Sequence, residues 1–370
     1  MSEPEPLQQV DRTYVWYRGG KLSYFAGCDY FRMSTHPRVN KALKVGVERF
    51  GLNVAASRLT TGNHVLYREL EEKLADFFGA PDALMVANGY MAGIIAAEAL
   101  AGTFSHALLD EKAHPSLWDA ARFLDCPMLQ FKHRDLADFA RAVNRCGRMS
   151  RLLVLTDGLF AHDGSVAPLK EYLNLLPKDG VVLLDDAHAA GILGRRGRGM
   201  VEHAQVSRRQ VIQAVTLSKA FGIYGGAILG SKALRNRLIR KSRSYAASTP
   251  MPLPLVNAAL EALKILKRDQ SFTRRLVQNT QYVREALSGG GFNLPAAPGP
   301  ILALHYKRAT VVSELKRALL AARIHPPFIC YPGGPKAGYF RFVISSEHSL
   351  SQLDRLVKVL NSKPTFRQLV

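Results

Sequence analysis

The sequence contains few cysteines. There are four in 370 residues, at positions 28, 126, 146 and 330, and no two of them form a C-x-x-C pair. This wide spacing argues against a disulfide framework and against a zinc site, whose ligands usually come in close pairs. We therefore expect no structural metal and a reducing compartment, which makes a cytoplasmic protein the natural prediction.

Long apolar segments are also missing. No stretch of about 18 consecutive apolar residues occurs, the length that a transmembrane helix requires. Residues 1–10 are acidic and contain proline, so they lack the basic and apolar regions of a signal peptide. The sequence thus predicts no membrane span and no secretion.

Acidic residues are scarce relative to basic ones. The chain has 50 Lys and Arg against 30 Asp and Glu, a formal net charge of +20. Such a charge can attract nucleic acid, a membrane surface or an anionic substrate, or simply keep a protein soluble. The basic residues are spread along the chain without a single-sign tail or a nucleic-acid-binding motif, so nucleic acid is not an expected partner. A basic mouth would suit a substrate that carries phosphates.

The most informative stretch runs from residue 181 to residue 229. The apolar run Val181–Leu184 ends in D-D-A-H, and the run Val211–Thr216 ends just before a lysine. Short apolar runs bounded by polar residues and glycines are typical of buried parallel strands. Ligands of open α/β sheets bind beyond the carboxyl ends of the strands. The residues expected in one crevice are Asp185, His188, Thr216 and Lys219.

These side chains share a possible chemistry. Lys219 lies among apolar neighbours, where an amine can lose its proton and form a Schiff base with an aldehyde. Asp185 can pair with a pyridinium nitrogen, His188 can reach a neighbouring oxygen, and Thr216 can approach a phosphate. Taken singly, D-D-A-H also fits a metal site or a polar loop, and a lysine after a strand is usually solvated. The combination in this order is much more specific.

The segments T-L-S-K-A-F-G and D-D-A-H-A-A-G-I-L-G-R-R-G-R-G resemble those of the α-oxoamine synthases. These are fold-type-I pyridoxal-phosphate enzymes that condense an amino acid with an acyl-CoA, and the resemblance extends from about Leu22 to the C-terminus. It implies an α/β fold with a mostly parallel seven-stranded sheet and a small C-terminal α/β domain. The ranges expected are 1–38 for an N-terminal segment with a hairpin, 39–252 for the large cofactor-binding domain and 253–370 for the small domain.

The resemblance also implies roles for the residues of the crevice. Lys219 would carry the cofactor, Asp185 would face the pyridine nitrogen, and His188 would bond the phenolic oxygen. His114, in the segment A-H-P-S, matches the histidine that stacks on the pyridine face, although a histidine before proline is more often only a loop residue. The proposed catalytic residues are thus Lys219, His114, Asp185 and His188.

Further residues are expected to bind the phosphate and the substrate. A strand over 83–87 followed by Gly89-Tyr90 and a helix start forms an anion site, which by resemblance holds the cofactor phosphate. Ser248 and Thr249 match hydroxyl residues that reach the phosphate of the neighbouring subunit, which implies a homodimer; the same proline-rich segment can also be a domain boundary. Arg341 matches the arginine that binds the substrate carboxylate with its two-pronged guanidinium, although a strand arginine is often only a surface residue.

Three positions depart from the pattern of the family. Cys28 replaces the Asn of an N-D-Y motif, Tyr67 replaces a His ahead of L-E, and Ala161 replaces a common Ser. Cys28 puts contacts to the substrate in doubt, and Ala161 removes one polar contact to the cofactor or the substrate. Two other classes stay open at this point: a pyridoxal-phosphate aminotransferase, and a basic binding protein with a degenerate site, against which the four catalytic candidates argue.

The remaining secondary structure follows from local patterns. Gly19-Gly20 between two apolar-rich runs predicts a β-hairpin. Helical spacing of leucines predicts a helix that Gly79 closes, one continuous helix over 255–287, and an amphipathic helix over 350–360.

Overall fold

The computed structural model describes residues 5–331, 334–335 and 337–369. The chain packs into two compact units. The larger unit comprises His36–Phe160 and Val166–Asp269, and the smaller one comprises Met1–Thr35, Ala161–Ser165 and Gln270–Val370. Compact packing by itself does not define independently folding domains, so the ranges 1–38, 39–252 and 253–370 stay a prediction.

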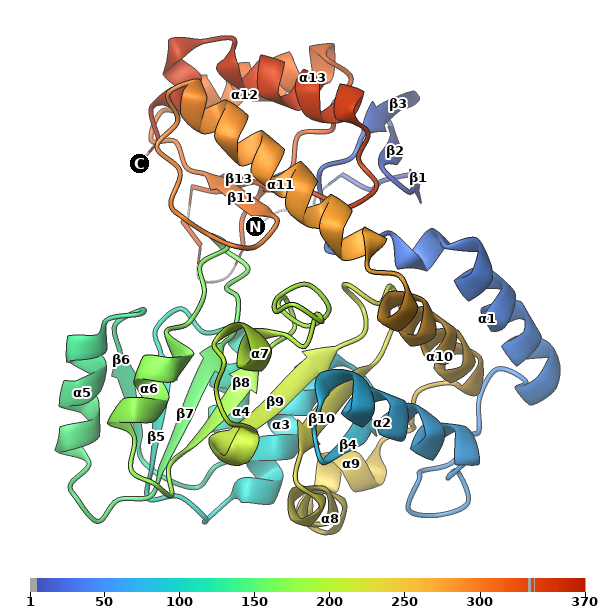
Figure 1. Cartoon of the computed structure of the whole chain (residues 1–370), viewed down its shortest axis with the longest axis vertical. Coiled ribbons are helices and arrows are strands. Elements are labelled where there is room, and N and C mark those ends of the chain that lie inside the picture. Colours follow the sequence, from blue (N-terminus) through green and yellow to red (C-terminus); the bar gives the residue numbers. More distant parts are fainter. Residues whose placement is uncertain (1–4, 332–333, 336, 370) are drawn as a thin grey trace. The chain divides into compact units, whose positions relative to one another are not determined.

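A seven-stranded sheet forms the centre of the larger unit, as predicted (Figure 1). Strand β10 runs antiparallel to both of its neighbours, and the pairs from β9 through β6 are parallel. In spatial order the strands are β4 (Asp82–Val86), β10 (Gly226–Gly230), β9 (Val211–Thr216), β8 (Val181–Asp185), β7 (Leu152–Asp157), β5 (His106–Asp110) and β6 (Met128–Phe131).

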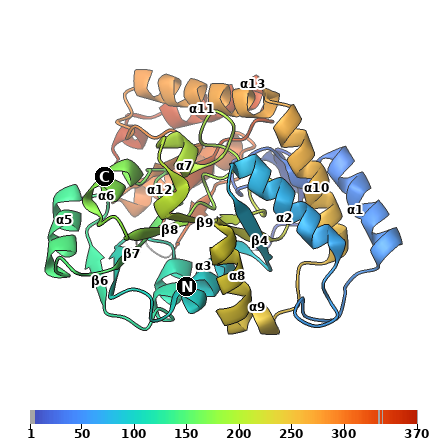
Figure 2. The same cartoon turned by 60° about the horizontal axis from the view of Figure 1, so that its bottom comes forward.

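Helices cover both faces of this sheet (Figures 1 and 2). Helices α3 and α4 lie on one face, and α6 and α7 lie on the other. The α-helices of the larger unit are α1 (Pro37–Phe50), α2 (Val65–Phe78), α3 (Gly89–Leu100), α4 (Pro115–Ala121), α5 (Leu136–Arg145), α6 (Leu169–Leu175), α7 (Met200–His203), α8 (Lys232–Lys241), α9 (Arg243–Ala247) and α10 (Leu253–Arg268).

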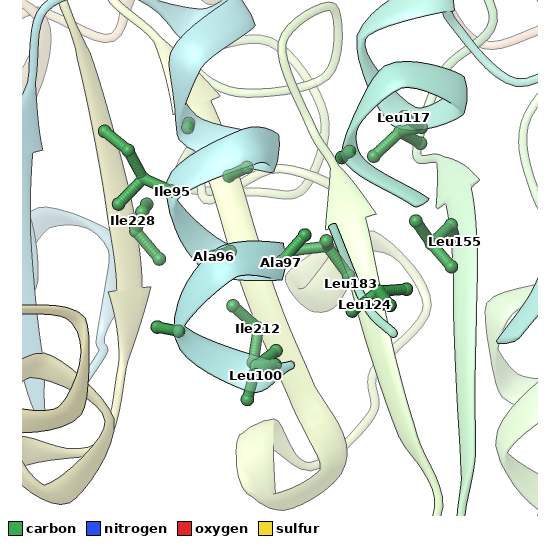
Figure 3. Packing of buried hydrophobic residues seen from close by; sticks show 14 of the residues in the cluster. Ile95, Ala96, Ala97, Leu100, Leu117, Leu124, Leu155, Leu183, Ile212 and Ile228 are labelled. Carbon is green, nitrogen blue, oxygen red and sulfur yellow. The ribbon is translucent and has the colours of Figure 1, made fainter. Parts of the chain in front are cut away.

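The main core lies between α3 and the sheet (Figure 3). Ile95 and Leu100 of α3 pack with Ile212 of β9 and Ile228 of β10, and all four are at most 7% exposed. Alanines and Gly93 make up much of the rest of α3, so the helix can approach the strands closely. Each large side chain buried there contributes roughly 1.5–3 kcal/mol. The strand ends that carry the predicted site therefore rest on a tightly packed layer.

The smaller unit contains two three-stranded sheets. One has the order β11 (Ile301–Leu304), β13 (Tyr339–Val343), β12 (Phe328–Ile329), and packs with α11 (Ser271–Gly289), α12 (Ala309–Ala321) and α13 (Leu350–Asn361) around one apolar cluster. The other consists of β1 (Gln9–Asp11), β2 (Tyr14–Tyr17) and β3 (Gly20–Ser23).

Most of the locally predicted elements occur. The hairpin turns at Gly19, whose φ of 72° favours glycine, and Gly79 ends α2 in the left-handed conformation. The prediction of a single helix over 255–287 is wrong, because α10 ends at Arg268 and α11 begins at Ser271. The break falls at Asp269, whose backbone is extended. Aspartate favours helix ends because its side chain competes for the backbone hydrogen bonds of a helix.

No helix in the described part of the chain has the length and apolar character needed to cross a membrane. The four cysteines are all free of disulfide bonds.

Candidate active site

Two adjacent acids at the end of β8 have different environments. Asp185 is partly exposed, and its Oδ1 accepts the Ala187 N–H at 3.0 Å. Asp186 is fully buried; its carboxylate accepts the N–H of Met200 at 3.0 Å and the amide of Gln213 at 2.5 Å. Burial raises the pKa of Asp186 to about 7. Asp186 therefore anchors the turn, and Asp185 is the acid available to a ligand.

The turn after β8 contacts the turn after β9. A Cβ atom added at Gly191, which has a φ of 89°, would lie 2.6 Å from the Cβ of Ala220. His188 is 7% exposed within the first of these turns, and Lys219 lies in the second. The close approach that Gly191 permits thus holds the two turns side by side. One turn contains His188, and the other contains Lys219.

Lys219 occupies the apolar setting that the sequence indicates. Its neighbours Leu217, Ala220 and Phe221 are at most 1% exposed, whereas Lys219 itself is half-buried. Thr216, at the end of β9, donates its hydroxyl to the Gly225 carbonyl at 3.2 Å and holds the start of the turn.

The N-terminus of α3 lies against the same strand end. A Cβ at Gly89 would come within 2.7 Å of the Thr216 Cβ, so only glycine allows the helix to begin so close to β9. The side chain of Asn88 caps the helix by accepting the Met91 N–H at 3.0 Å. Tyr90 is exposed and hydrogen-bonds Asp119 through its hydroxyl. The first turn of α3 and Thr216 therefore lie together, and a helix N-terminus is a place that favours an anion.

His114 is the N-cap residue of α4 and belongs to the same electrostatic group. Its main-chain N–H donates to Asp157 Oδ1 at 3.1 Å, and Asp157 pairs in register with Asp185 on the neighbouring strand. Burial lowers the pKa of His114, an effect that the Asp185 carboxylate opposes and the Lys219 charge reinforces. Burial, and then the charge of Asp185, raise the pKa of Asp157 well above its ordinary value.

Ser248 and Thr249 follow α9 on a segment that α2 and its preceding loop hold in place. Ser57 donates its hydroxyl to the Ala246 carbonyl at 2.6 Å, and Tyr67 donates its hydroxyl to the Met251 carbonyl at 2.7 Å. Tyr67, one of the three departures from the family pattern, is therefore a structural clamp on this segment. The described contacts do not bring Ser248 or Thr249 into the group around Lys219.

Arg341 lies on β13 of the smaller unit. Its guanidinium lies 5.3 Å from the ring centre of Tyr331, and its Nη1 lies 3.5 Å from the carbonyl oxygen of Ala161. Burial and the nearby thiol of Cys28 raise the pKa of Tyr30, and the charge of Arg341 opposes that rise. The loop 28–30 and Arg341 are thus neighbours within this unit.

Two residues of the group around Lys219 were not among the site residues predicted from the sequence. One is Asp157, whose pairing opposite Asp185 depends on strand register. The other is Ser116, whose hydroxyl contacts His114 Nδ1 at 2.7 Å and Asp185 Oδ2 at 3.3 Å. The available signal was a serine two residues after a histidine at a helix start.

The residues fit pyridoxal phosphate on the chemistry of their side chains. Lys219 supplies an amine in an apolar setting for the aldehyde, and Asp185 supplies an accessible carboxylate for the ring nitrogen. The close approach of Gly89 to Thr216 places a helix N-terminus, which favours a phosphate, beside the end of β9.

A groove of about 980 Å³ lies elsewhere in the larger unit, between α1, α2 and α10. Among the described residues that line it, none is a predicted site residue. Its charged lining consists of Arg38, Lys41, Lys73, Lys264, Lys267 and Arg268 with Glu69, Asp76 and Glu261. Two ion pairs neutralise part of it, Arg38 with Glu261 and Lys267 with Asp76, and the net positive charge of the chain is partly concentrated here.

Comparisons with known proteins agree with this geometry. The family model described as aminotransferase class I and II matches residues 28–360. The chain is 33% identical over 350 residues to the 8-amino-7-oxononanoate synthase of Thermosipho melanesiensis, covering 94% of this chain and 90% of that protein. It is 34% identical over 364 residues to the enzyme of the same name from Methylococcus capsulatus, covering 96% and 92%.

Solved structures give the same result. The serine palmitoyltransferase of Sphingomonas wittichii superimposes with a TM-score of 0.89 at 25% identity, over 95% of this chain and 90% of that one. A structure of SPT with PLP superimposes with a TM-score of 0.90 at 26% identity, over 96% and 92%.

The chain belongs to the aminotransferase class I and II family. It is a pyridoxal-phosphate-dependent transferase of fold type I. Within that class it is an acyltransferase of the α-oxoamine synthase type.

Proposed function

We propose that this enzyme joins a small amino acid to the acyl group of a thioester, either an acyl-CoA or an acyl carrier protein. A carbon–carbon bond forms between the α-carbon and the acyl carbon, and the products are an α-oxoamine, carbon dioxide and a free thiol. The observation that carries the proposal is the grouping of Lys219, Asp185 and His114 beyond the ends of strands β9, β8 and β5 of the central sheet.

Pyridoxal phosphate, when bound, withdraws electrons from the bonds of an amino acid's α-carbon. Lys219 Nζ would hold the cofactor through its aldehyde and, once displaced, remove the α-proton. The carboxylate of Asp185 would keep a proton on the ring nitrogen, and His188 would donate to the phenolic oxygen. His114 would cover one face of the ring.

Backbone and hydroxyl groups would hold the phosphate. The N–H groups of Gly89 and Tyr90 begin α3 beside the Thr216 hydroxyl, which supports this role. Ser248 and Thr249 would reach the phosphate of a partner subunit, so we propose a homodimer.

Arg341 would bind the carboxylate of the amino acid. Its position beside the loop 28–30 supports this role, because that loop resembles a substrate loop of the family. Cys28 gives the loop a thiol where an amide is expected, and Ala161 gives a methyl group where a hydroxyl is common. Both changes are expected to alter substrate preference rather than the reaction.

The branch that we favour is 8-amino-7-oxononanoate synthase, which joins alanine to a pimeloyl thioester in biotin synthesis. The segment T-L-S-K-A-F-G-x-x-G-G-A and the names of the curated relatives support it. A serine palmitoyltransferase-like enzyme or a 2-amino-3-ketobutyrate CoA ligase is the alternative, and the SPT structures favour the former. The four free cysteines are consistent with a location of the enzyme in the cytosol.

A panel of amino acids and acyl thioesters, supplied with and without a keto acid, tests the proposal. Free thiol and carbon dioxide are measured together. The expected result is release of the two in equal amounts with one small amino acid, independent of the keto acid. Amino transfer to the keto acid, with no thioester consumed across the acyl panel, would instead make this chain an aminotransferase.

A further inference from the structure

Ser116 lies between His114 and Asp185, the two residues that, in the proposed function, contact the cofactor ring. Its hydroxyl oxygen is 2.7 Å from His114 Nδ1 and 3.3 Å from Asp185 Oδ2. Its main-chain N–H donates to the same His114 Nδ1 at 3.2 Å. The side chain is 1% exposed, so water cannot easily replace either partner.

Counting hydrogens decides which of these contacts can exist together. A backbone N–H can only donate, so the bond from the Ser116 N–H requires a lone pair on His114 Nδ1. The single hydroxyl hydrogen of Ser116 is then best placed on the nearer acceptor, which is Nδ1 rather than Asp185. A neutral imidazole with a lone pair on Nδ1 carries its hydrogen on Nε2.

We propose that Ser116 is a positioning residue that holds neutral His114 in the tautomer with the hydrogen on Nε2. The ring then carries a hydrogen-bond donor, and not a base, at Nε2. A second proton would have to add at Nδ1. In that event Nδ1–H donates to the Ser116 oxygen, and the hydroxyl turns to donate to Asp185. Ser116 therefore couples the protonation of His114 to the carboxylate of Asp185.

The surroundings of His114 favour the neutral ring. The ionisable groups that face it are Asp157 from β7, Asp185 from β8, Lys219 from the turn after β9, and Tyr90 from α3, whose ring centre lies 6.2 Å away. The Asp157 bond to the His114 main chain fixes the backbone on one side, and the cap of α4 fixes it on the other. The main chain of His114 is therefore held by Asp157, and its ring is held at Nδ1 by Ser116.

The experiment uses the full chain without cofactor, with ¹⁵N-labelled histidine. Long-range ¹H–¹⁵N correlation spectra at pH 8 report the tautomer, and the His114 signals are assigned by their loss in His114→Gln. The wild-type protein should show a protonated Nε2 and a lone-pair Nδ1. Ser116→Ala should shift the tautomer ratio about fivefold toward Nδ1–H, the scale of one hydrogen bond, so the two ¹⁵N shifts move toward each other. Ser116→Thr, which keeps the hydroxyl, should restore the wild-type spectrum.

Ser242→Ala is the matched control, because it removes another buried serine hydroxyl, one that bonds Glu98 instead of His114. It should leave the His114 signals unchanged. Should the threonine variant not fold, Ser116→Cys offers a weaker donor, and its shifts should lie between those of wild type and alanine. A hydrogen on Nδ1 in the wild-type protein, or an unchanged spectrum in Ser116→Ala, would overturn the inference. Because no cofactor is present, failure of the proposed reaction would leave this result untouched.

Discussion

The buried ring of His348 makes the stability of the smaller unit depend on pH. Its Nδ1 accepts the Ser345 N–H at 3.0 Å, and its Nε2 donates to the Tyr24 carbonyl at 3.1 Å. Phe25 stacks on the ring at 4.1 Å. Burial, above all, lowers the pKa of His348 from 6.5 to about 3. The ring is therefore neutral in the folded protein at every pH above that value.

The unfolded chain takes up a proton on His348 below its ordinary pKa, while the native state does not. The stabilisation is complete above pH 6.5 and is lost as the pH falls toward 3. Between pH 7 and pH 5 the loss amounts to about 2 kcal/mol, from roughly 1.5 pH units at about 1.4 kcal/mol per unit.

Urea unfolding at pH 7 and at pH 5 tests this for wild type, His348→Gln and a control, His203→Gln, in which the substituted histidine is exposed. Other groups titrate equally in all three proteins, so the differences isolate His348. Wild type and the His203 variant should lose about 2 kcal/mol more than His348→Gln. An equal loss in His348→Gln would show that the reasoning about this ring is wrong.

Three further changes test other parts of the structure. Asp185→Asn should slow turnover about 10²- to 10³-fold, the usual effect of removing a preorganised electrostatic partner, and an unchanged α-proton exchange rate would exclude the role. Arg341→Ala should raise the KM for the amino acid more than the KM for the thioester. Added salt should instead weaken binding of the thioester more than binding of the amino acid, because exposed charges are screened. A larger effect of Arg341→Ala on the thioester KM would count against the carboxylate site. Glu71→Gln should cost about 3–5 kcal/mol of unfolding free energy, because Glu71 is fully buried and paired with Arg58. The exposed Glu72→Gln control should cost at most about 0.5 kcal/mol, and similar losses in the two would refute the buried pair.

The sequence predicted the elements whose pattern is local. The apolar runs ending at Leu184 and Thr216 are strands. Asp185 and Thr216 are the last residues of these strands, and His188 and Lys219 lie in the contacting turns that follow. In these elements propensity, burial and chemistry agree. Gly89 was expected from the strand and helix start around it, and His114 from the resemblance to the family; their roles stay predictions.

Other features depend on contacts between distant residues. The register that sets Asp157 opposite Asp185, and the hydroxyl of Ser116 between His114 and Asp185, follow from how strands and α4 pack. The leucine spacing on both sides of Asp269 predicted one continuous helix, but the backbone becomes extended at Asp269. No pattern within one segment reports such arrangements.

Covalent mapping of the cofactor tests the central assignment most directly. The purified protein is loaded with pyridoxal phosphate, reduced with borohydride so that the cofactor is fixed to the lysine that holds it, and digested for mass spectrometry. The account predicts the pyridoxyl mass on the peptide that contains Lys219, with loss of that label and of turnover in Lys219→Ala. A label on another lysine, or full turnover in the alanine variant, would contradict it.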